Sequence, residues 1–139
     1  EGATDRASFQ NFSFNFDSAA GIIYTVDVTK PKGEKITIIS MADGTPFSMD
    51  KMYKVALNSY RGNGGGELLT KGAGIPQDEL KGRILFSTDK DLRYYLMQYI
   101  EKKGVIEPHA LGQWKFIPEE WVEPAAKRDY EYLFGKVEK

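Results

Sequence analysis

The sequence predicts an α/β fold of the α+β type, in which helices cover a mainly antiparallel or mixed sheet. Two observations lead to this prediction. Over roughly the first ninety residues, apolar and polar residues alternate in short runs that end in Gly, Pro, Asn or Asp, which is typical of strands joined by turns. Further along, residues 87–104 carry apolar residues at helical spacing between capping residues. The 139 residues are 41% hydrophobic and 28% charged, so we expect a single domain over 1–139.

The strands of this sheet are expected in four segments. Residues 21–41 have the pattern of a β-hairpin, because two alternating segments flank a Pro-Lys-Gly turn at 31–33. Residues 9–16 alternate Phe with Asn and Ser, so this segment can pair with the hairpin as a half-buried strand. Residues 52–58 are predicted to form a strand that leads into a glycine-rich loop, and 113–118 a short closing strand.

Two helices are expected. In the first, over 87–104, Thr88 and Asp91 have the spacing of a capping box, and Gly104 stands where a left-handed C-terminal residue is favoured. Its apolar stripe should cover one face of the sheet and consists of Leu92, Tyr95, Leu96 and Tyr99. Residues 125–134 are predicted to form a second helix with Pro124 near its first turn, within a C-terminal helical extension over 119–139.

Composition and charge exclude several classes of function. The chain has 19 Lys and Arg against 20 Asp and Glu, so no basic field suits it to a nucleic acid polymer. It has no cysteine, which excludes disulfides, thiolate metal ligands and cysteine nucleophiles but leaves the compartment open. No run approaches the ~18 apolar residues of a membrane span, so we expect no transmembrane segment. Residues 1–10 do not read as an export leader, so an exported protein would have lost it or carry it outside this chain.

His109 is the single histidine of the chain. A zinc or dinuclear hydrolase site needs several imidazole or carboxylate ligands around the metal, and one histidine cannot supply a mixed cluster of that type. No calcium-loop motif occurs either. We therefore expect no catalytic residue, metal or cofactor in this chain alone.

The stretch 58–66, read NSYRGNGGG, contains four glycines in five positions beside an aromatic residue. It matches neither the dinucleotide-binding pattern nor a P-loop, and a hairpin turn is one interpretation. The other is a binding site, because Tyr60 flanked by Asn58, Arg61 and Asn63 offers a flat face beside donors and acceptors. A buried core tyrosine competes with this second interpretation. Trp114 and Trp121 could stack on sugars, but their apolar neighbours favour packing.

Several motifs resemble the C-terminal domain of the 5'-nucleotidase family, which includes 2',3'-cyclic-nucleotide 2'-phosphodiesterases and UDP-sugar hydrolases. Residues 53–58 match Tyr-x-Val-Ala-x-Asn, and 58–66 match the family loop Asn-Ser/Asn-Tyr/Phe-Arg/Leu-Ala-x-Gly-Gly-Gly/Asp except for Gly62 at the Ala position. Residues 104–108 match Gly-x-Ile-x-Pro, and 114–118 match Trp-x-x-x-Pro. The hairpin is also similar to the family pattern. The resemblance covers about residues 9–118 and corresponds to the second half of that domain.

The resemblance implies a division of labour between two domains. In the family, an N-terminal metallophosphatase domain holds two divalent metal ions, while the C-terminal domain binds the nucleotide or nucleoside. That catalytic domain would lie in the same or a neighbouring chain, and the protein would be extracytoplasmic: periplasmic, secreted or on the cell surface. Tyr60 takes the position that stacks on the nucleobase. Binding residues implied beside it are Asn58, Arg61, Asn63, Gly64, Gly65 and Gly66.

Two departures from the family pattern matter. Gly66 stands where many nucleotidases have an aspartate that binds the ribose hydroxyls, and the Tyr60–Arg61 pair looks more like the cyclic-phosphodiesterase/3'-nucleotidase branch. Nothing before residue 9 corresponds to the first half of the domain, which supplies a second aromatic and phosphate-binding arginines. The expected function is nucleotide recognition for an exported metal-dependent phosphoesterase that acts in nucleotide catabolism. The alternative is a non-enzymatic binding or surface module that keeps the fold with a decayed nucleotide site.

Overall fold

The computed structural model describes residues 15–135 of the chain. The chain divides into two compact units, one of Glu1–Lys51 with Ala110–Lys139 and one of Met52–His109. The expectation of a single domain over 1–139 stays a prediction. The strand expected over 9–16 lies almost wholly outside the described residues.

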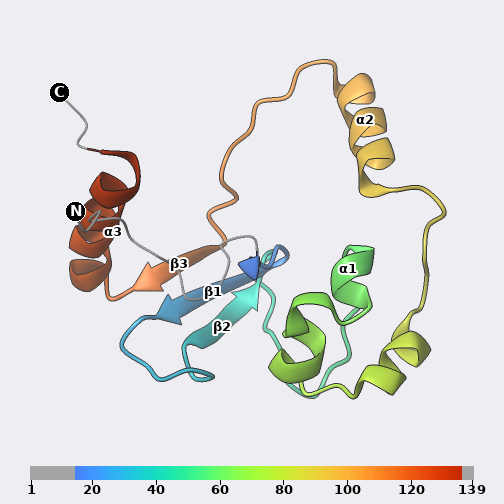
Figure 1. Ribbon diagram of the computed structural model, residues 1–139, viewed down its shortest axis with the longest axis horizontal. Coiled ribbons are helices and arrows are strands. Elements are labelled where there is room, and N and C mark those ends of the chain that lie inside the picture. The colour runs from blue at the N-terminus through green and yellow to red at the C-terminus, as the bar shows by residue number, and fades with distance from the viewer. Residues whose placement is uncertain (1–14, 136–139) are drawn as a thin grey trace, which may run out of the picture. The chain divides into compact units, whose positions relative to one another are not determined.

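The first unit contains a three-stranded mixed sheet in the order β2-β1-β3 (Figure 1). Strand β1 (Ile22–Asp27) pairs antiparallel with β2 (Ile36–Met41) and parallel with β3 (Trp114–Ile117). The two segments of the predicted hairpin and the predicted closing strand are therefore confirmed, and so is the α+β class with a mixed sheet. Gly33 permits the turn between β1 and β2 with a φ of 94°.

Aromatic residues form the core beside this sheet. Tyr24 on β1 is only 6% exposed, and its ring stacks on that of Trp114 with centroids 6.0 Å apart. The Trp114 ring also meets Phe116 edge-on at 5.1 Å and Phe16 at 5.8 Å. Trp114 is thus a packing residue, as its apolar neighbours predicted. Trp121 is 61% exposed, so the packing prediction is wrong for that residue.

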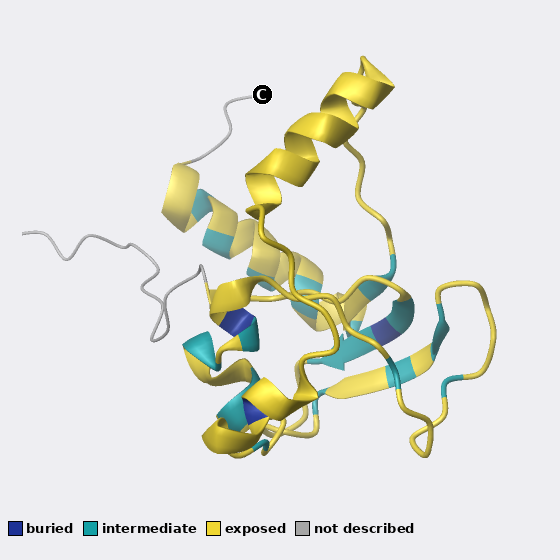
Figure 2. Ribbon diagram, turned by 90° about the vertical axis from the view of Figure 1, so that its right-hand side faces the viewer, coloured by how far each residue is buried: buried dark blue, intermediate teal, exposed yellow. Residues whose placement is uncertain are grey.

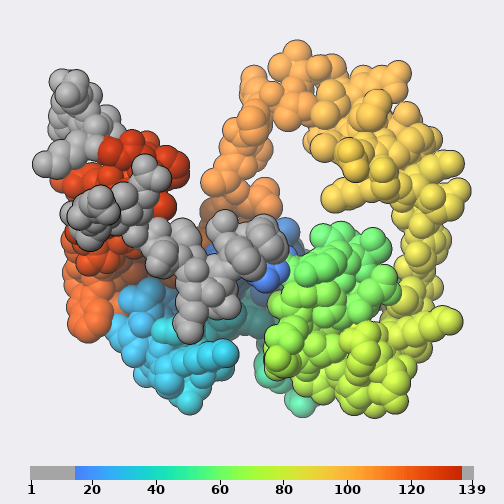
Figure 3. Space-filling model, viewed as in Figure 1, coloured from blue at the N-terminus to red at the C-terminus, as the bar shows by residue number. Residues whose placement is uncertain are grey.

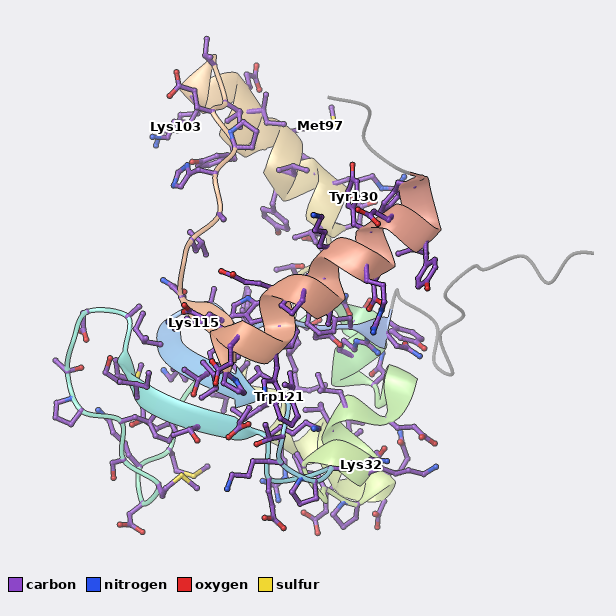
Figure 4. The ribbon with its side chains drawn as sticks, turned by 90° about the vertical axis from the view of Figure 1, so that its left-hand side faces the viewer. Lys32, Met97, Lys103, Lys115, Trp121 and Tyr130 are labelled. Atoms are coloured by element: carbon purple, nitrogen blue, oxygen red, sulfur yellow. The ribbon has the colours of Figure 1, made fainter. Side chains whose placement is uncertain are left out.

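Helix α3 (Glu119–Phe134) follows β3 directly and contacts it (Figure 4). It begins six residues before the predicted start at 125, where the C-terminal extension was expected to begin. Two acidic residues in its first turn suit the positive end of the helix dipole, and Glu119 pairs with Lys115 at 2.5 Å. Pro124 lies inside the helix rather than near its start. The prediction failed there because proline is most favoured in a first turn.

The second unit is built from short helical turns and one longer helix. In chain order these are α1 (Ser59–Gly62), η2 (Gly65–Glu67), η3 (Leu68–Gly72), η4 (Gln77–Arg83) and α2 (Leu92–Lys103). Within this unit, α1, η2 and η3 contact one another, and Figure 3 shows them in green. Leu80 on η4 is the single buried apolar residue among the described residues of this unit.

The strand predicted over 52–58 is wrong, because these residues have no regular secondary structure. Its alternating pattern suits a strand, but a strand is stable only when its backbone pairs with a neighbour. Met52 and Val55 are 87% and 73% exposed, so these two side chains do not form part of a packed strand face.

Helix α2 confirms the predicted helix but not its packing. It begins at Leu92 rather than at the predicted 87, because Asp91 rather than Thr88 is the N-cap and accepts from the Tyr94 amide at 2.9 Å. Gly104 ends it with a φ of 76°. All residues of α2 are exposed, including Leu92, Leu96 and Tyr99 of the predicted stripe, and Figure 2 shows the whole helix in yellow. The packing of that stripe on the sheet stays a prediction. Tyr94 and Met97 lie outside that stripe, so the apolar residues surround the helix instead of marking one face.

No helix among residues 15–135 is long and apolar enough to span a membrane.

Candidate functional site

The glycine-rich stretch begins with a single capped helical turn. The Asn58 side-chain Oδ1 accepts from the Arg61 amide at 2.8 Å, and the Asn58 carbonyl accepts from Gly62 at 2.9 Å. Asn58 has an extended backbone, as an N-cap residue should. The turn ends at Asn63, whose amide donates to the Ser59 carbonyl at 3.0 Å. Asn58 therefore shapes the turn that presents Tyr60.

The glycines after this turn are needed for two different reasons. Gly64 and Gly66 have φ values of 92° and 68°, in the left-handed region that favours glycine. Gly65 is needed for close approach, because a Cβ there would lie 2.6 Å from Cδ2, Cε2 and the carbonyl oxygen of Tyr60. The loop thus closes against the aromatic ring, with the backbone of Gly65 touching one ring edge. It lies between short helices, so the hairpin-turn interpretation is wrong.

Tyr60 is 57% exposed, so the interpretation as a buried core tyrosine is also wrong. Behind the ring lies the guanidinium of Arg61, with Cζ 5.3 Å from the ring centroid. Arg61 itself is only 4% exposed, and its Nη1 donates to the Gly65 carbonyl at 3.2 Å. A cation over the ring and a hydrogen bond to the loop both hold the ring in place. The rest of the ring surface remains accessible.

The structure brings Tyr60, Arg61 and Gly65 into one cluster. Asn58 supports the cluster through its cap, and Asn63 and Gly64 continue the loop. Gly66 is exposed. Sequence reasoning missed two residues of η4, Gln77 and Leu80, which contact the loop from later in the chain. The sequence around Gln77 carries no motif that indicates this contact.

Other ionisable groups with a defined setting lie outside the glycine-rich stretch 58–66. His109 is exposed, and its Nδ1 lies 3.2 Å from the Glu107 carbonyl. Among residues 15–135 no group of three or more His, Cys, Asp or Glu could hold a metal ion. Hydrogen bonds from Thr29 and Thr45 hold the pKa values of Asp27 and Asp43 below the ordinary range; Asp27 ends β1 and Asp43 lies in a turn, both in the first unit.

Comparison with known protein families identifies the family of the segment that contains this loop. Residues 3–71 match the family described as "5'-nucleotidase, C-terminal domain", and the match includes all of 58–66. This chain belongs to the 5'-nucleotidase C-terminal domain family. The resemblance predicted from its motifs is confirmed.

Two curated relatives agree with this assignment. The "Trifunctional nucleotide phosphoesterase protein YfkN" of Bacillus subtilis is 31% identical over 121 residues, which is 78% of this chain and 8% of the relative. The "2',3'-cyclic-nucleotide 2'-phosphodiesterase/3'-nucleotidase" of Haemophilus influenzae is 26% identical over 121 residues, 76% of this chain and 17% of the relative. The chain thus spans less than a fifth of the length of either relative. No solved structure matches it.

Proposed function

We propose that this chain is the nucleotide- or nucleoside-recognition part of an exported, metal-dependent phosphoesterase, with Tyr60 as the stacking platform for the nucleobase. The observation that carries the proposal is the exposed Tyr60 ring, held against Gly65 on one edge and backed by the buried Arg61. A rigid, exposed aromatic face beside backbone polar groups suits a planar ligand with polar edges.

The family membership supports a nucleotide over other planar ligands. Both relatives are named for action on nucleotides or cyclic nucleotides. The Tyr60–Arg61 pair favours the cyclic-phosphodiesterase/3'-nucleotidase branch over strict 5'-nucleotidases. Under this proposal the substrate is a 5'-, 3'- or cyclic nucleotide, and the protein works outside the cytoplasm.

The catalytic step belongs to a separate domain under this proposal. Two divalent metal ions in an N-terminal metallophosphatase domain would activate the water and stabilise the phosphoryl transition state. This chain would hold the nucleoside so that the phosphate reaches those metals. Its single histidine supports that division, because the chain has too few imidazoles for such a cluster.

The contribution of Tyr60 can be estimated from known stacking platforms. Base–aromatic stacking contributes about 1–3 kcal/mol per base. A tenfold change in affinity corresponds to about 1.4 kcal/mol, so loss of the ring should raise KM for a nucleotide roughly 5- to 150-fold. Since stacking acts on bound substrate and transition state alike, kcat should change little.

The test compares Tyr60→Ala and Tyr60→Phe in the complete polypeptide that carries this chain and its metal domain. Tyr60→Ala should raise KM for nucleotides and leave hydrolysis of an aryl phosphate, which has no nucleobase, nearly unchanged. Tyr60→Phe should behave like the original protein, because stacking needs the ring face. Tyr132→Ala on α3, where Tyr132 is 45% exposed, is the matched control. A folded Tyr60→Ala enzyme with an unchanged nucleotide KM would refute the proposal that Tyr60 stacks on the nucleobase.

A second candidate is a non-enzymatic binding or surface module with a decayed nucleotide site. Gly66 favours it, because the aspartate that binds ribose hydroxyls in many relatives of the nucleotidase branch is absent here. The two candidates differ in what accompanies the chain. A metallophosphatase domain upstream in the same polypeptide, or in a neighbouring reading frame, supports the enzyme, and its absence supports the module.

A further inference from the structure

Gln77 reaches back from η4 to the glycine loop, although it lies beyond the segment that matches the family. Its Nε2 donates to the carbonyl of Asn63 at 3.0 Å. Its Oε1 lies over Gly64, where a Cβ would be 2.5 Å from that oxygen and 3.1 Å from Cδ1 of Leu80. Leu80 is 5% exposed. One amide and one buried leucine of η4 therefore pack on the start of the loop.

The hydrogen bond from Gln77 lies at the point where helix α1 ends and the glycine-rich loop begins. Asn63 is the C-cap of α1, and carbonyls at a helix end need partners from outside the helix. A hydrogen bond to its carbonyl fixes the peptide plane that leads into Gly64, where the chain turns left-handed. Gly65 follows directly and touches the Tyr60 ring. A continuous series of contacts thus joins Gln77 to the ring.

We propose that Gln77 is a positioning residue for the nucleobase site: its amide fixes the Asn63–Gly64 peptide so that Gly65 holds the Tyr60 ring ready to stack. The proposal rests on the function proposed above. Its physical basis is preorganisation, because a ring that is already held in its bound position loses less conformational freedom when the ligand arrives.

The side-chain chemistry determines which variants test this role. Gln77→Met keeps the length and removes the amide donor, and Gln77→Glu keeps the shape but places a carboxylate against the Asn63 carbonyl. Gln98→Met on the exposed surface of α2 is the matched control. Unfolding midpoints of all variants show whether the fold is retained.

The first measurement needs only the 139-residue chain. Amide ¹⁵N heteronuclear NOEs report the order of Gly64, Gly65 and Gly66 on the fast timescale. We expect them to fall in Gln77→Met and Gln77→Glu and to stay unchanged in Gln98→Met. If the NOEs of these loop amides are unchanged in both Gln77 variants, the positioning role is refuted, while the proposed stacking role of Tyr60 is unaffected.

The second measurement uses the complete enzyme. Loss of one hydrogen bond of ordinary strength should raise the nucleotide KM about three- to tenfold while leaving kcat and the aryl phosphate KM unchanged. In a Tyr60→Ala background, Gln77→Met should add nothing, because its effect passes through the ring. An equal effect in both backgrounds would show that Gln77 acts by another route. If Tyr60→Ala raises the nucleotide KM and Gln77→Met does not, only the positioning role of Gln77 is refuted. If Tyr60→Ala leaves the nucleotide KM unchanged, the proposed stacking role of Tyr60 is refuted as well.

Discussion

Gly65→Ala is the sharpest perturbation of the candidate site, because it acts on Tyr60 without changing Tyr60. The new Cβ would lie 2.6 Å from two ring carbons and from the backbone carbonyl of Tyr60, about 0.8 Å inside the 3.4 Å at which ordinary contact begins. A ring rotation relieves the first two contacts but not the third, so the loop backbone must move as well. Overpacking of this kind costs about 1–3 kcal/mol.

That strain should appear as displacement of the ring from its position over Arg61. We expect the nucleotide KM to rise about tenfold or more, corresponding to about 1.4 kcal/mol, with the aryl phosphate KM unchanged. The assay compares both substrates in the complete enzyme, together with the unfolding midpoint. Gly82→Ala on η4 is the control, because a Cβ there meets nothing within 4 Å. If Gly65→Ala and Gly82→Ala behave alike, the ring is not held by the loop.

Three further predictions concern the cap, the charges and the catalytic division. Asn58→Ala should lower the free energy of unfolding by about 1 kcal/mol, because it removes the acceptor of the Arg61 amide, while Asn58→Asp should keep most of it; equal denaturant midpoints would contradict this. Thr45→Val should raise the pKa of Asp43 in a carboxyl-carbon NMR titration. Because the pKa of Asp43 is lower in the folded than in the unfolded state, its carboxylate stabilises the fold at neutral pH, and this stabilisation is lost as pH falls below about 4. The free energy of unfolding of Thr45→Val should therefore fall less over that pH range than that of the original protein. The 139-residue chain should show no phosphoesterase activity with added zinc, manganese or cobalt; turnover that a chelator abolishes in a contaminant-free sample would contradict this.

Local patterns predicted the parts of the structure that depend on local chemistry. The β1–β2 hairpin follows from period-two alternation around a Pro-Lys-Gly turn, and helix α2 follows from apolar spacing that ends at Gly104. At Tyr60 the local pattern left a binding-site ring and a buried core tyrosine open, and the structure has the exposed ring. In each case the determining residues lie within a few positions of one another.

The failures arise where distant partners decide the outcome. Residues 52–58 have a strand pattern, but pairing depends on a neighbouring strand that the pattern cannot specify. On α2, Tyr94 and Met97 lie outside the predicted stripe, so the apolar residues do not mark a single face, and which face packs depends on partners that the local pattern does not name. The hydrogen bond of Gln77 joins it to Asn63, fourteen residues earlier, and a single glutamine in the sequence does not indicate which residue it will contact.

The backbone beyond Gly66 supports a binding role for the loop over a simple turn. Glu67 has a φ of 61° and is the single non-glycine residue with positive φ among residues 15–135. A side chain in this region costs about 1–2 kcal/mol. The salt bridge of Glu67 with Lys71 offsets little of that cost, because both side chains are more than half exposed. Backbone strain concentrates at sites that hold ligands, and here it follows immediately after the residues that hold the Tyr60 ring. A loop serving only to reverse the chain requires neither this strained residue nor a buried guanidinium behind an exposed ring.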